Sequence, residues 1–466
     1  MKKVLAMILA LTMIFSLAAC ASNEAAPTDA PATENAAAVN SATEAVAEHT
    51  EEVSLTFWAF SKWAGVTGKE TDGQTGDWEK AMAEKFHEMH PNVTINVEVF
   101  DFTSGPEKAA AAIAAGETPD VIHDAETRMM KYSNAGYLVS VFDYMSDTDL
   151  ATYNDGAIDS VSLADGNAYW LPFGAAPMGL MVNKSLFEQA GCADLLPQGE
   201  DRTWTIDEFY TAVTTALENL DNVYGVPLFA DTTDGETFSF IWTFAHGGRI
   251  VDSSSNTMAC NTDKARNGLT FWKKMIDEGI ATPGGASLKA SEVWSLFNTQ
   301  QVLCAPAAAV NYSRAVKAQA DGTAEQFDIM LYAMPHAEGE DTVAVAFPHG
   351  FGVWQNEDPE ALYWSQEFVK FLASDENATA ISAAAEFSYK KCAQDMYAGN
   401  EDANIQFASQ LMNYLIPNGS TVPGYTSLRN EIMPYYQQLY LGEISVDEFC
   451  EQVEEMGNEF LANYES

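Results

Sequence analysis

The chain has 466 residues and carries 67 acidic against 23 basic side chains, a formal net charge of −44. This balance argues against binding to nucleic acid and against attachment to anionic lipid by charge, because both partners are themselves negative. With 47% hydrophobic and 11% aromatic residues, the chain can bury more than one core, so we expect two packed domains.

The N-terminus has the pattern of a secretory signal. Two lysines precede an apolar run over residues 4–17, which is too short to span a bilayer. Leu17-Ala18-Ala19-Cys20 closes the run and resembles the lipobox of bacterial lipoproteins. Residues 1–19 are therefore predicted to be a signal peptide, and Cys20 to be a lipidated residue. The alternative is an ordinary secretory signal followed by an incidental cysteine.

A tether is expected to follow the lipidated cysteine, over residues 20–52. Residues 21–50 contain no aromatic side chain and are rich in Ala, Thr, Glu, Asn and Pro. Such a segment cannot bury enough apolar surface to fold. A lipid on Cys20 would then hold a folded body at the extracytoplasmic face of the bacterial cell membrane.

Strands and helices alternate in the next part of the chain. Residues 53–60 form a β-prone apolar run, Asp77 is predicted to cap a helix, and residues 93–99 alternate between apolar and polar as a half-buried strand does. An Ala-rich helix over 108–115 and a short strand over 119–122 follow. The predicted buried face of the first helix comprises Trp78, Ala81, Met82, Phe86 and Met89. This β-α-β-α order predicts an α/β sheet, with ligands beyond the carboxyl ends of its strands.

Later segments continue the α/β pattern. Residues 180–183 are predicted to form a strand, and helices are expected over 263–278 and 359–372. Two capping boxes, at residues 205–208 and 445–448, mark the starts of two further helices. The remaining cysteines are widely spaced and lack a C-x-x-C pair, so we expect them to be free and mostly buried. They are Cys192, Cys260, Cys304, Cys392 and Cys450.

The order of these segments resembles the extracellular solute-binding proteins, family 1, of ABC transporters, a group that includes maltose- and oligosaccharide-binding proteins. The resemblance runs from about Val53 to the C-terminus and rests on several strings in the same order. They occupy residues 114–121, 135–138, 142–144, 165–172, 182–191, 202–209 and 442–445.

The resemblance implies a two-lobed, periplasmic-binding-protein-like α/β fold (type II) with a ligand cleft between lobes joined by hinge segments. Its three crossovers are expected near residues 173–176, 348–350 and 399–404. The first α/β lobe would comprise residues 53–172 plus 351–398, and the second would comprise 177–347 plus 405–466.

Aromatic platforms and hydrogen-bonding side chains are what a sugar receptor needs. By position in the family, the first lobe would contribute Trp58, Phe60, Trp63, Asp124, Glu126 and Arg128. The second lobe would contribute Trp242, Trp294, Tyr312 and Tyr425, with His349 at the second crossover. Two alternatives stay open: Trp58 fits a core position equally well, and the three charged residues could pair with one another at a helix start.

Other aromatic residues and motifs are assigned to structure. Trp78, Trp272 and Trp364 fall on helix faces and are expected in the core, and Trp204 is expected to pack at a helix start. Residues 87–90 lack the H-E-x-x-H spacing, residues 65–70 lack P-loop spacing, and residues 231–236 lack EF-hand periodicity. We therefore expect no metal, no cofactor and no enzymatic activity.

The function that the resemblance implies is that of a membrane-anchored lipoprotein of an ABC importer. It would capture a carbohydrate, an oligosaccharide, by lobe closure and deliver it to the permease, and we expect it to be a monomer that binds no nucleic acid. Two alternatives stay open. One is a secreted glycoside hydrolase, which needs two carboxyl groups across the scissile bond. The other is an ABC receptor for a non-sugar solute such as a glycerol phosphodiester or a peptide.

Overall fold

The computed structural model describes residues 49–67, 70, 72–101, 104–163, 165–230, 234–381, 386–393 and 396–464. The predicted signal peptide, Cys20 and nearly all of the predicted tether lie outside these residues. Residues from His49 onward form one compact unit. Among the described residues, no helix is long and apolar enough to cross a membrane.

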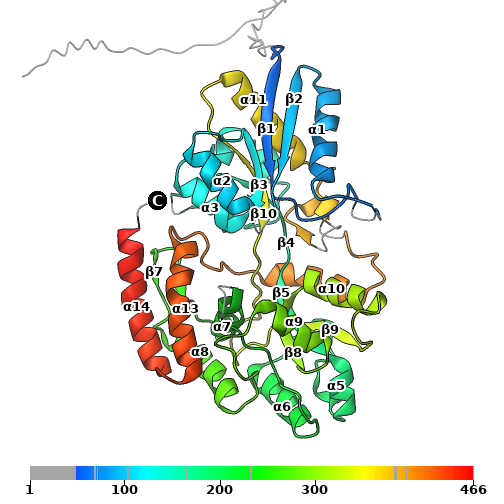
Figure 1. The fold of residues 1–466 in the computed structure, drawn as a ribbon, viewed down its shortest axis with the longest axis vertical. Helices are drawn as coiled ribbons and strands as arrows, with labels where there is room; N and C mark the ends of the chain where they lie inside the picture. Colours follow the sequence, from blue (N-terminus) through cyan, green and yellow to red (C-terminus); the bar gives the residue numbers. More distant parts are fainter. Residues whose placement is uncertain are drawn as a thin grey trace, which may run out of the picture. The chain divides into compact units, whose positions relative to one another are not determined.

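Two sheets, each with its own helices, organise the described part of the chain (Figure 1). The first has six strands in the order β11-β4-β10-β3-β1-β2. They are β1 (Val53–Ala59), β2 (Val93–Val99), β3 (Val121–Ala125), β4 (Leu171–Ala175), β10 (His349–Val353) and β11 (Phe387–Ser388). β1 runs parallel to β2 and β3, while β10 is antiparallel to β3 and β4, so the chain returns to this sheet from elsewhere before forming β10.

The second sheet has three strands in the order β8-β5-β9, with both neighbours antiparallel to β5. They are β5 (Met178–Asn183), β8 (Cys304–Ala308) and β9 (Ile329–Tyr332). A separate two-stranded ribbon pairs β6 (Val251–Asp252) with β7 (Thr257–Met258). Buried apolar side chains form one large cluster around the first sheet and two clusters around the second, which share its strands residue by residue, so each sheet has its own core.

The helices divide in the same way. The helices that connect strands of the first sheet along the chain are α1 (Asp77–Met89), α2 (Gly105–Ala114), α3 (Glu126–Asn134), α4 (Asp147–Leu150) and α11 (Pro359–Leu372). The others are α5 (Lys184–Gln189), α6 (Ile206–Leu217), α7 (Asp234–Ala245), α8 (Asp263–Asp277), α9 (Ala290–Asn298), α10 (Ala309–Ala320), α12 (Ala403–Gln410), α13 (Tyr425–Leu441) and α14 (Val446–Asn463). Short 3-10 turns are η1 (Val141–Asp143), η2 (Asp159–Val161), η3 (Ala193–Leu195), η5 (Lys391–Ala393) and η6 (Leu411–Tyr414).

The chain passes between the two sheets three times. It leaves β4 for β5 through residues 176–177, returns from β9 to β10 through residues 333–348, and leaves β11 for α12 before residue 403. We expect the hinge segments of the two-lobe division in these passages, and the boundaries of that division remain a proposal.

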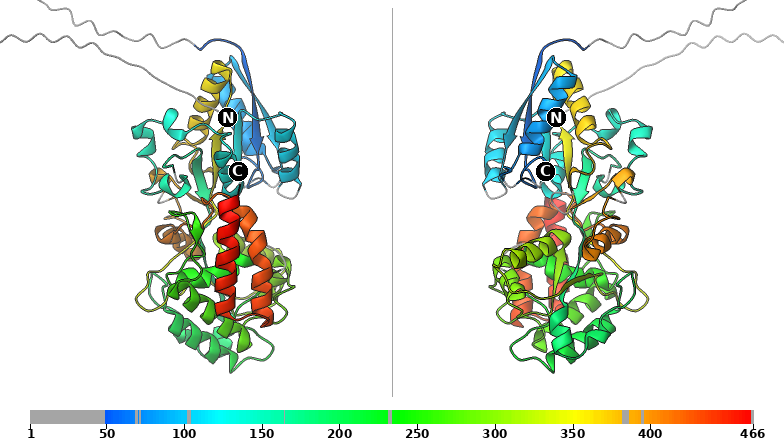
Figure 2. Two further views of the ribbon diagram at one scale, coloured as in Figure 1. Left: turned by 90° about the vertical axis from the view of Figure 1, so that its left-hand side faces the viewer. Right: turned by 90° about the vertical axis from the view of Figure 1, so that its right-hand side faces the viewer.

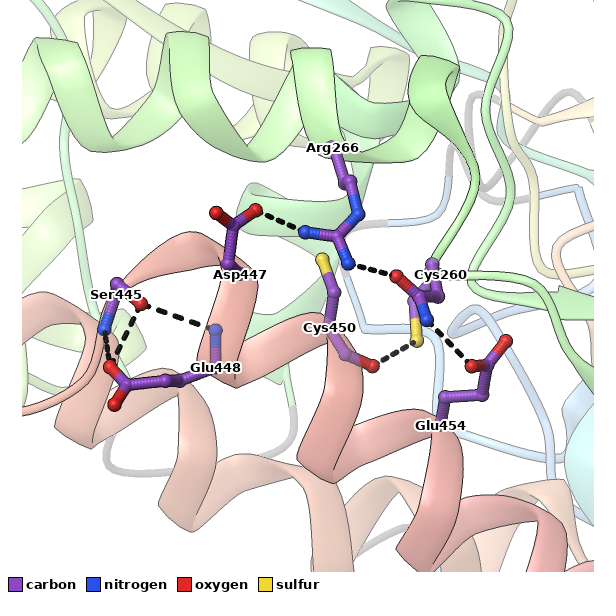
Figure 3. A network of polar contacts seen from close by, with 8 residues as sticks. Cys260, Arg266, Ser445, Asp447, Glu448, Cys450 and Glu454 are labelled. Carbon is purple, nitrogen blue, oxygen red and sulfur yellow. Dashed lines mark hydrogen bonds and ion pairs between the residues drawn. The ribbon is translucent and has the colours of Figure 1, made fainter.

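The last two helices run side by side, and Figure 2 shows them together. The predicted capping box opens α14: the Ser445 hydroxyl accepts from the Glu448 backbone N–H at 3.2 Å, and the Glu448 carboxylate accepts from the Ser445 N–H at 2.8 Å. Figure 3 shows Arg266 of α8 reaching Asp447 in the same turn, so the start of α14 is held against α8. The same view includes Cys260 and Cys450, two of the five free cysteines in the described part of the chain, among which only Cys392 is exposed.

Most predicted elements are confirmed, with one correction at α1. Gly76, not Asp77, is its N-cap residue, and its φ of 89° lies in the left-handed region. A Cβ on Gly76 would lie 2.3 Å from Val99 Cγ2, so this position requires glycine. Met89, the last residue of α1, was predicted to be buried but is 49% exposed. Glu79 was not part of the predicted buried face, yet its side chain is fully buried.

Candidate functional site

A cavity of about 900 Å³ lies where the elements of the two sheets meet. One wall comes from the first sheet's side, with Glu126 at the start of α3, residues 154–160 around η2, and residues 387–393 from β11 to η5. The other wall comes from residues 409–421, which include the end of α12, η6 and the loop before α13. Ala346 and Pro348, in the passage from β9 to β10, complete the lining. A solute in this cavity would therefore contact parts of the chain that belong to both sheets.

Glu126 joins the two walls directly. Its backbone N–H donates to the Pro348 carbonyl at 2.8 Å, and its carboxylate accepts from the Ser420 hydroxyl and from Asn418 Nδ2, the latter at 3.2 Å. The Asn418 amide also donates to the Ala346 carbonyl at 3.1 Å, so the loop is tied to the β9–β10 passage as well. Burial raises the pKa of Glu126 to about 7, because the two donors offset only part of the cost of removing its charge from water.

Asp124 and Arg128, the other charged residues predicted to bind the ligand, form an ion pair with each other. Arg128 Nε donates to Asp124 Oδ2 at 2.8 Å, and its Nη2 donates to the second carboxylate oxygen. The guanidinium lies 4.4 Å from the centroid of the Phe60 ring. Asp124 is fully buried, and burial raises its pKa. Neither Asp124 nor Arg128 lines the cavity, and their pairing is the alternative that the sequence left open.

His349 lies at the start of β10, fully enclosed rather than at the cavity surface. Its Nδ1 is 2.7 Å from His123 Nε2, and its Nε2 is 2.5 Å from Glu386 Oε2. His123 Nδ1 is in turn 3.2 Å from Glu79 Oε1. These four side chains form a continuous buried row, which we call the proton chain. His349 and Glu386 are the sequence neighbours of the cavity-lining residues Pro348 and Phe387.

The aromatic residues of the first lobe lie in its core. Trp58 and Phe60 each pack against Phe100 with ring centroids 5.2 Å apart. Trp63 packs 5.3 Å from Trp78 and 6.5 Å from His349, with its indole N–H unpaired among the described residues. None of these rings lines the cavity. Trp58 is a core residue, which is the alternative that the sequence left open.

The aromatic residues predicted from the second lobe are also away from the cavity. Trp242 is fully buried and stacks on Trp272 at 5.5 Å, inside the second core. Tyr312 donates to Asp402 at 2.7 Å, and Tyr425 donates to Glu236 at 3.3 Å. Trp294 is half-buried and lines a different surface hollow, formed with Asn298 and Glu325 among others. Glu126 is thus the one predicted ligand residue that lines the cavity, and ligand contact by the others remains a prediction that this cavity does not support.

Several cavity residues were absent from the predicted set. They are polar or aromatic side chains on loops, short 3-10 turns and the ends of β11 and α12: Asn154, Asp155, Ser388, Tyr389, Lys391, Gln410, Asn413, Asn418 and Ser420. The string Pro417-Asn418-Gly419-Ser420 has the composition of a turn, and Gly419 adopts a φ of 96°. That signal marks a loop but does not say what the loop faces. No group of three His, Cys, Asp or Glu side chains in the described part of the chain is arranged to hold a metal ion.

Comparison with known families decides the class of protein. The model of the family described as bacterial extracellular solute-binding protein matches residues 71–379. The chain belongs to this family. The family consists of binding proteins rather than enzymes, in agreement with the expectation from sequence.

Relatives of known sequence or structure are distant. A curated binding protein of Brucella abortus (strain 2308) is 24% identical over 237 residues, which cover 51% of this chain and 56% of that protein. The chain thus matches little more than half the length of its curated relatives.

Solved structures resemble the fold over most of its length. The cyclic α-maltosyl-1,6-maltose binding protein of Arthrobacter globiformis has a TM-score of 0.72 at 19% identity, covering 88% of this chain and 99% of that one. The sugar-binding protein MalE of Xanthomonas citri has a TM-score of 0.70 at 16% identity, covering 88% and 97%. The GacH receptor of Streptomyces glaucescens, solved unliganded and with acarbose, has a TM-score of 0.66 at 17% identity, covering 89% and 100%. These similarities confirm the predicted two-lobed binding-protein fold.

Proposed function

We propose that this solute-binding protein captures a carbohydrate, an oligosaccharide, in the cavity lined by Glu126 and residues 409–421, and delivers it to an ABC permease. The observation that carries the proposal is that the walls of one cavity come from elements of both sheets. A ligand held there contacts both lobes only when they are closed. Its binding free energy therefore favours the closed state.

The size and lining of the cavity suit a sugar. Its volume of about 900 Å³ is within the range of about 300–1,000 Å³ found for small-molecule sites. Asn413, Gln410 and Ser388 offer donors and acceptors for hydroxyl groups, and the rings of Phe387 and Tyr389 offer apolar surface for the C–H faces of sugar rings. The sugar ligands named for the structurally similar receptors support the same class of solute.

Closure converts binding into a change that the permease can recognise. Shifting a population from mostly open to mostly closed needs about a 10⁴-fold preference for the closed state. The Glu126 contacts with Asn418 and Ser420 already link the two walls, so the ligand need not supply all of this preference.

A lipid on Cys20 would keep the receptor beside its permease. The basic and apolar N-terminus and the Leu-Ala-Ala-Cys string support this part of the proposal. Cys20→Ala should move the protein from the membrane fraction to the soluble fraction and abolish incorporation of labelled fatty acid. An unchanged membrane fraction would contradict the anchor without affecting the ligand site.

A ligand panel tests the binding function. Thermal unfolding is measured with maltose, maltotriose, longer glucans, a glycerol phosphodiester and short peptides. A ligand at 100 times its Kd stabilises the fold by about 2.7 kcal/mol. Stabilisation by an oligosaccharide supports the proposal, whereas stabilisation by the phosphodiester or a peptide alone would overturn the solute class. Chromatography of the sugar after incubation must show no hydrolysis product.

Matched variants then test the cavity. Asn413→Ala removes a cavity side chain, and Asn219→Ala removes an exposed asparagine just after α6. We expect weaker binding of the sugar found in the panel for Asn413→Ala and unchanged binding for Asn219→Ala. Equal affinities for both variants would contradict this location of the site.

A further inference from the structure

The proton chain of Glu79, His123, His349 and Glu386 is buried along its whole length. His123 and Glu79 are 0% exposed, His349 is 1% exposed and Glu386 is 7% exposed. Its members come from α1, β3, β10 and the residue before β11, so it crosses the first sheet from its helix layer to the segment that lines the cavity. Three contacts of 3.2, 2.7 and 2.5 Å connect the four side chains.

Each of these contacts needs one proton between its two heavy atoms. A carboxylate has only lone pairs, and a neutral imidazole has one N–H and one lone pair. Two carboxylates and two neutral imidazoles therefore supply two protons for three contacts. If both histidines pointed their N–H groups outward to the carboxylates, two bare nitrogens would face each other at 2.7 Å in a site without water.

The missing proton can be located from the surroundings. Burial lowers the pKa of His349 to about 4, so its imidazole is neutral at pH 7. Burial alone would raise the pKa of Glu386, but the hydrogen bond with His349 and the nearby Lys62 ammonium hold it below its ordinary value. His349 therefore donates to Glu386 through Nε2 and accepts from His123 at Nδ1. The third proton then lies between His123 and Glu79, whose second oxygen has no hydrogen-bond partner among the described residues.

Other charged and titratable groups face the proton chain from every neighbouring element. Lys62 acts on His349 and Glu386 from the loop after β1, and the Asp124–Arg128 pair lies next to His123. Tyr389 and Tyr397 approach Glu386, and burial raises the pKa of both phenols, which stay neutral. With three protons, the four side chains of the proton chain have a net charge of −1, opposite in sign to the Lys62 ammonium.

We infer that the proton chain holds three shared protons at neutral pH and, by doing so, positions residues 386–393 against β10. His349 and Glu386 are the positioning residues, because one starts β10 beside Pro348 and the other precedes Phe387 and Ser388. Loss of the third proton at alkaline pH breaks one contact and loosens this wall of the cavity. The consequence for ligand capture rests on the proposed function, whereas the proton count does not.

Glu79→Gln tests the proton count, because an amide N–H replaces the missing proton covalently. At pH 7.5 the unfolded chain binds about two protons on these two imidazoles, and the folded wild type binds three. The unfolding equilibrium constant of the wild type should therefore rise about tenfold per pH unit relative to that of Glu79→Gln between pH 6.5 and 7.5. Glu84→Gln, an exposed change on the same helix, should stay parallel to the wild type.

Two further measurements on the full chain distinguish positioning from general stability. In ¹⁵N-histidine and ¹³C-carboxyl NMR spectra at pH 7.5, the protons on the two buried imidazoles and on the carboxyl groups of the proton chain should total three in the wild type and two in Glu79→Gln. Hydrogen exchange of the 386–393 amides, corrected for intrinsic base catalysis, should accelerate above pH 8 in the wild type and not in Glu79→Gln. Parallel unfolding curves for wild type and Glu79→Gln, or a total of only two protons on the imidazoles and carboxyl groups of the wild-type proton chain, would overturn the inference. None of these readouts uses a ligand, so they can fail or succeed independently of the proposed function.

Discussion

Glu126→Gln removes the one carboxylate that bridges the two walls of the cavity while keeping its shape. In the folded protein the pKa of Glu126 is raised from its ordinary value of 4.5 to about 7. The folded state therefore keeps a proton that the unfolded state has released between these two values, so the free energy of unfolding falls as pH rises from about 4.5 to 7. At about 1.36 kcal/mol per pKa unit, the loss amounts to about 3 kcal/mol above pH 7.

Glutamine has no charge to bury and should escape this loss. We expect Glu126→Gln and the wild type to have similar free energies of unfolding at about pH 4, and the variant to be more stable by about 3 kcal/mol at about pH 8. Urea titrations followed by tryptophan fluorescence at half-unit pH intervals measure the difference directly. Because both proteins contain the proton chain, its pH dependence cancels.

An exposed carboxylate provides the control. Glu117→Gln changes a residue on the surface after α2 and should shift the curve by a constant small amount at every pH. If the difference between Glu126→Gln and the wild type were equally flat, Glu126 would not be buried as the structure has it. The account of how the two walls are joined would then be wrong.

Three further substitutions test the packing that positions the site, each by urea denaturation. Ser445→Ala removes the side-chain cap of α14 and should cost about 1 kcal/mol. Arg429→Gln leaves the fully buried Glu236 carboxylate without its ion-pair partner and should cost about 3–5 kcal/mol. Gly350→Ala places a Cβ 1.9 Å from the Leu171 carbonyl oxygen and should destabilise the protein strongly, whereas Gly399→Ala meets no atom within 4 Å and should change stability little.

The opposite result for each substitution would contradict the contact on which its prediction rests. A neutral Ser445→Ala would mean that the start of α14 is held by its contact with Arg266 alone. A tolerated Arg429→Gln would mean that water or another cation reaches Glu236. Equal effects at Gly350 and Gly399 would mean that β4 and β10 are not as close as described.

Local structure was predictable where local rules decide it. The helix over residues 359–372, the capping boxes at Thr205 and Ser445, and the strand that became β5 all follow from periodicity and end signals within a few residues. The first turn of α1 was not predictable in this way. Its cap is Gly76 because Val99, on the neighbouring strand, leaves no room for a Cβ.

The sequence by itself determined the family, the α/β class and the order of elements, because these depend on strings of neighbouring residues that are read along the chain. Tertiary structure alone decided which side chains face the cavity. Trp242 and Trp63 are the residue type that forms sugar platforms, but other aromatic rings enclose them. Asn418 and Ser420 lie in a turn that its sequence does not mark as functional, yet both donate hydrogen bonds to Glu126. The physical reason is that the cavity is formed by segments nearly 300 positions apart in the chain, as the Glu126–Asn418 separation of 292 residues illustrates. The proton chain has the same origin, since His123 and His349 become neighbours only when β10 returns to pair with β3.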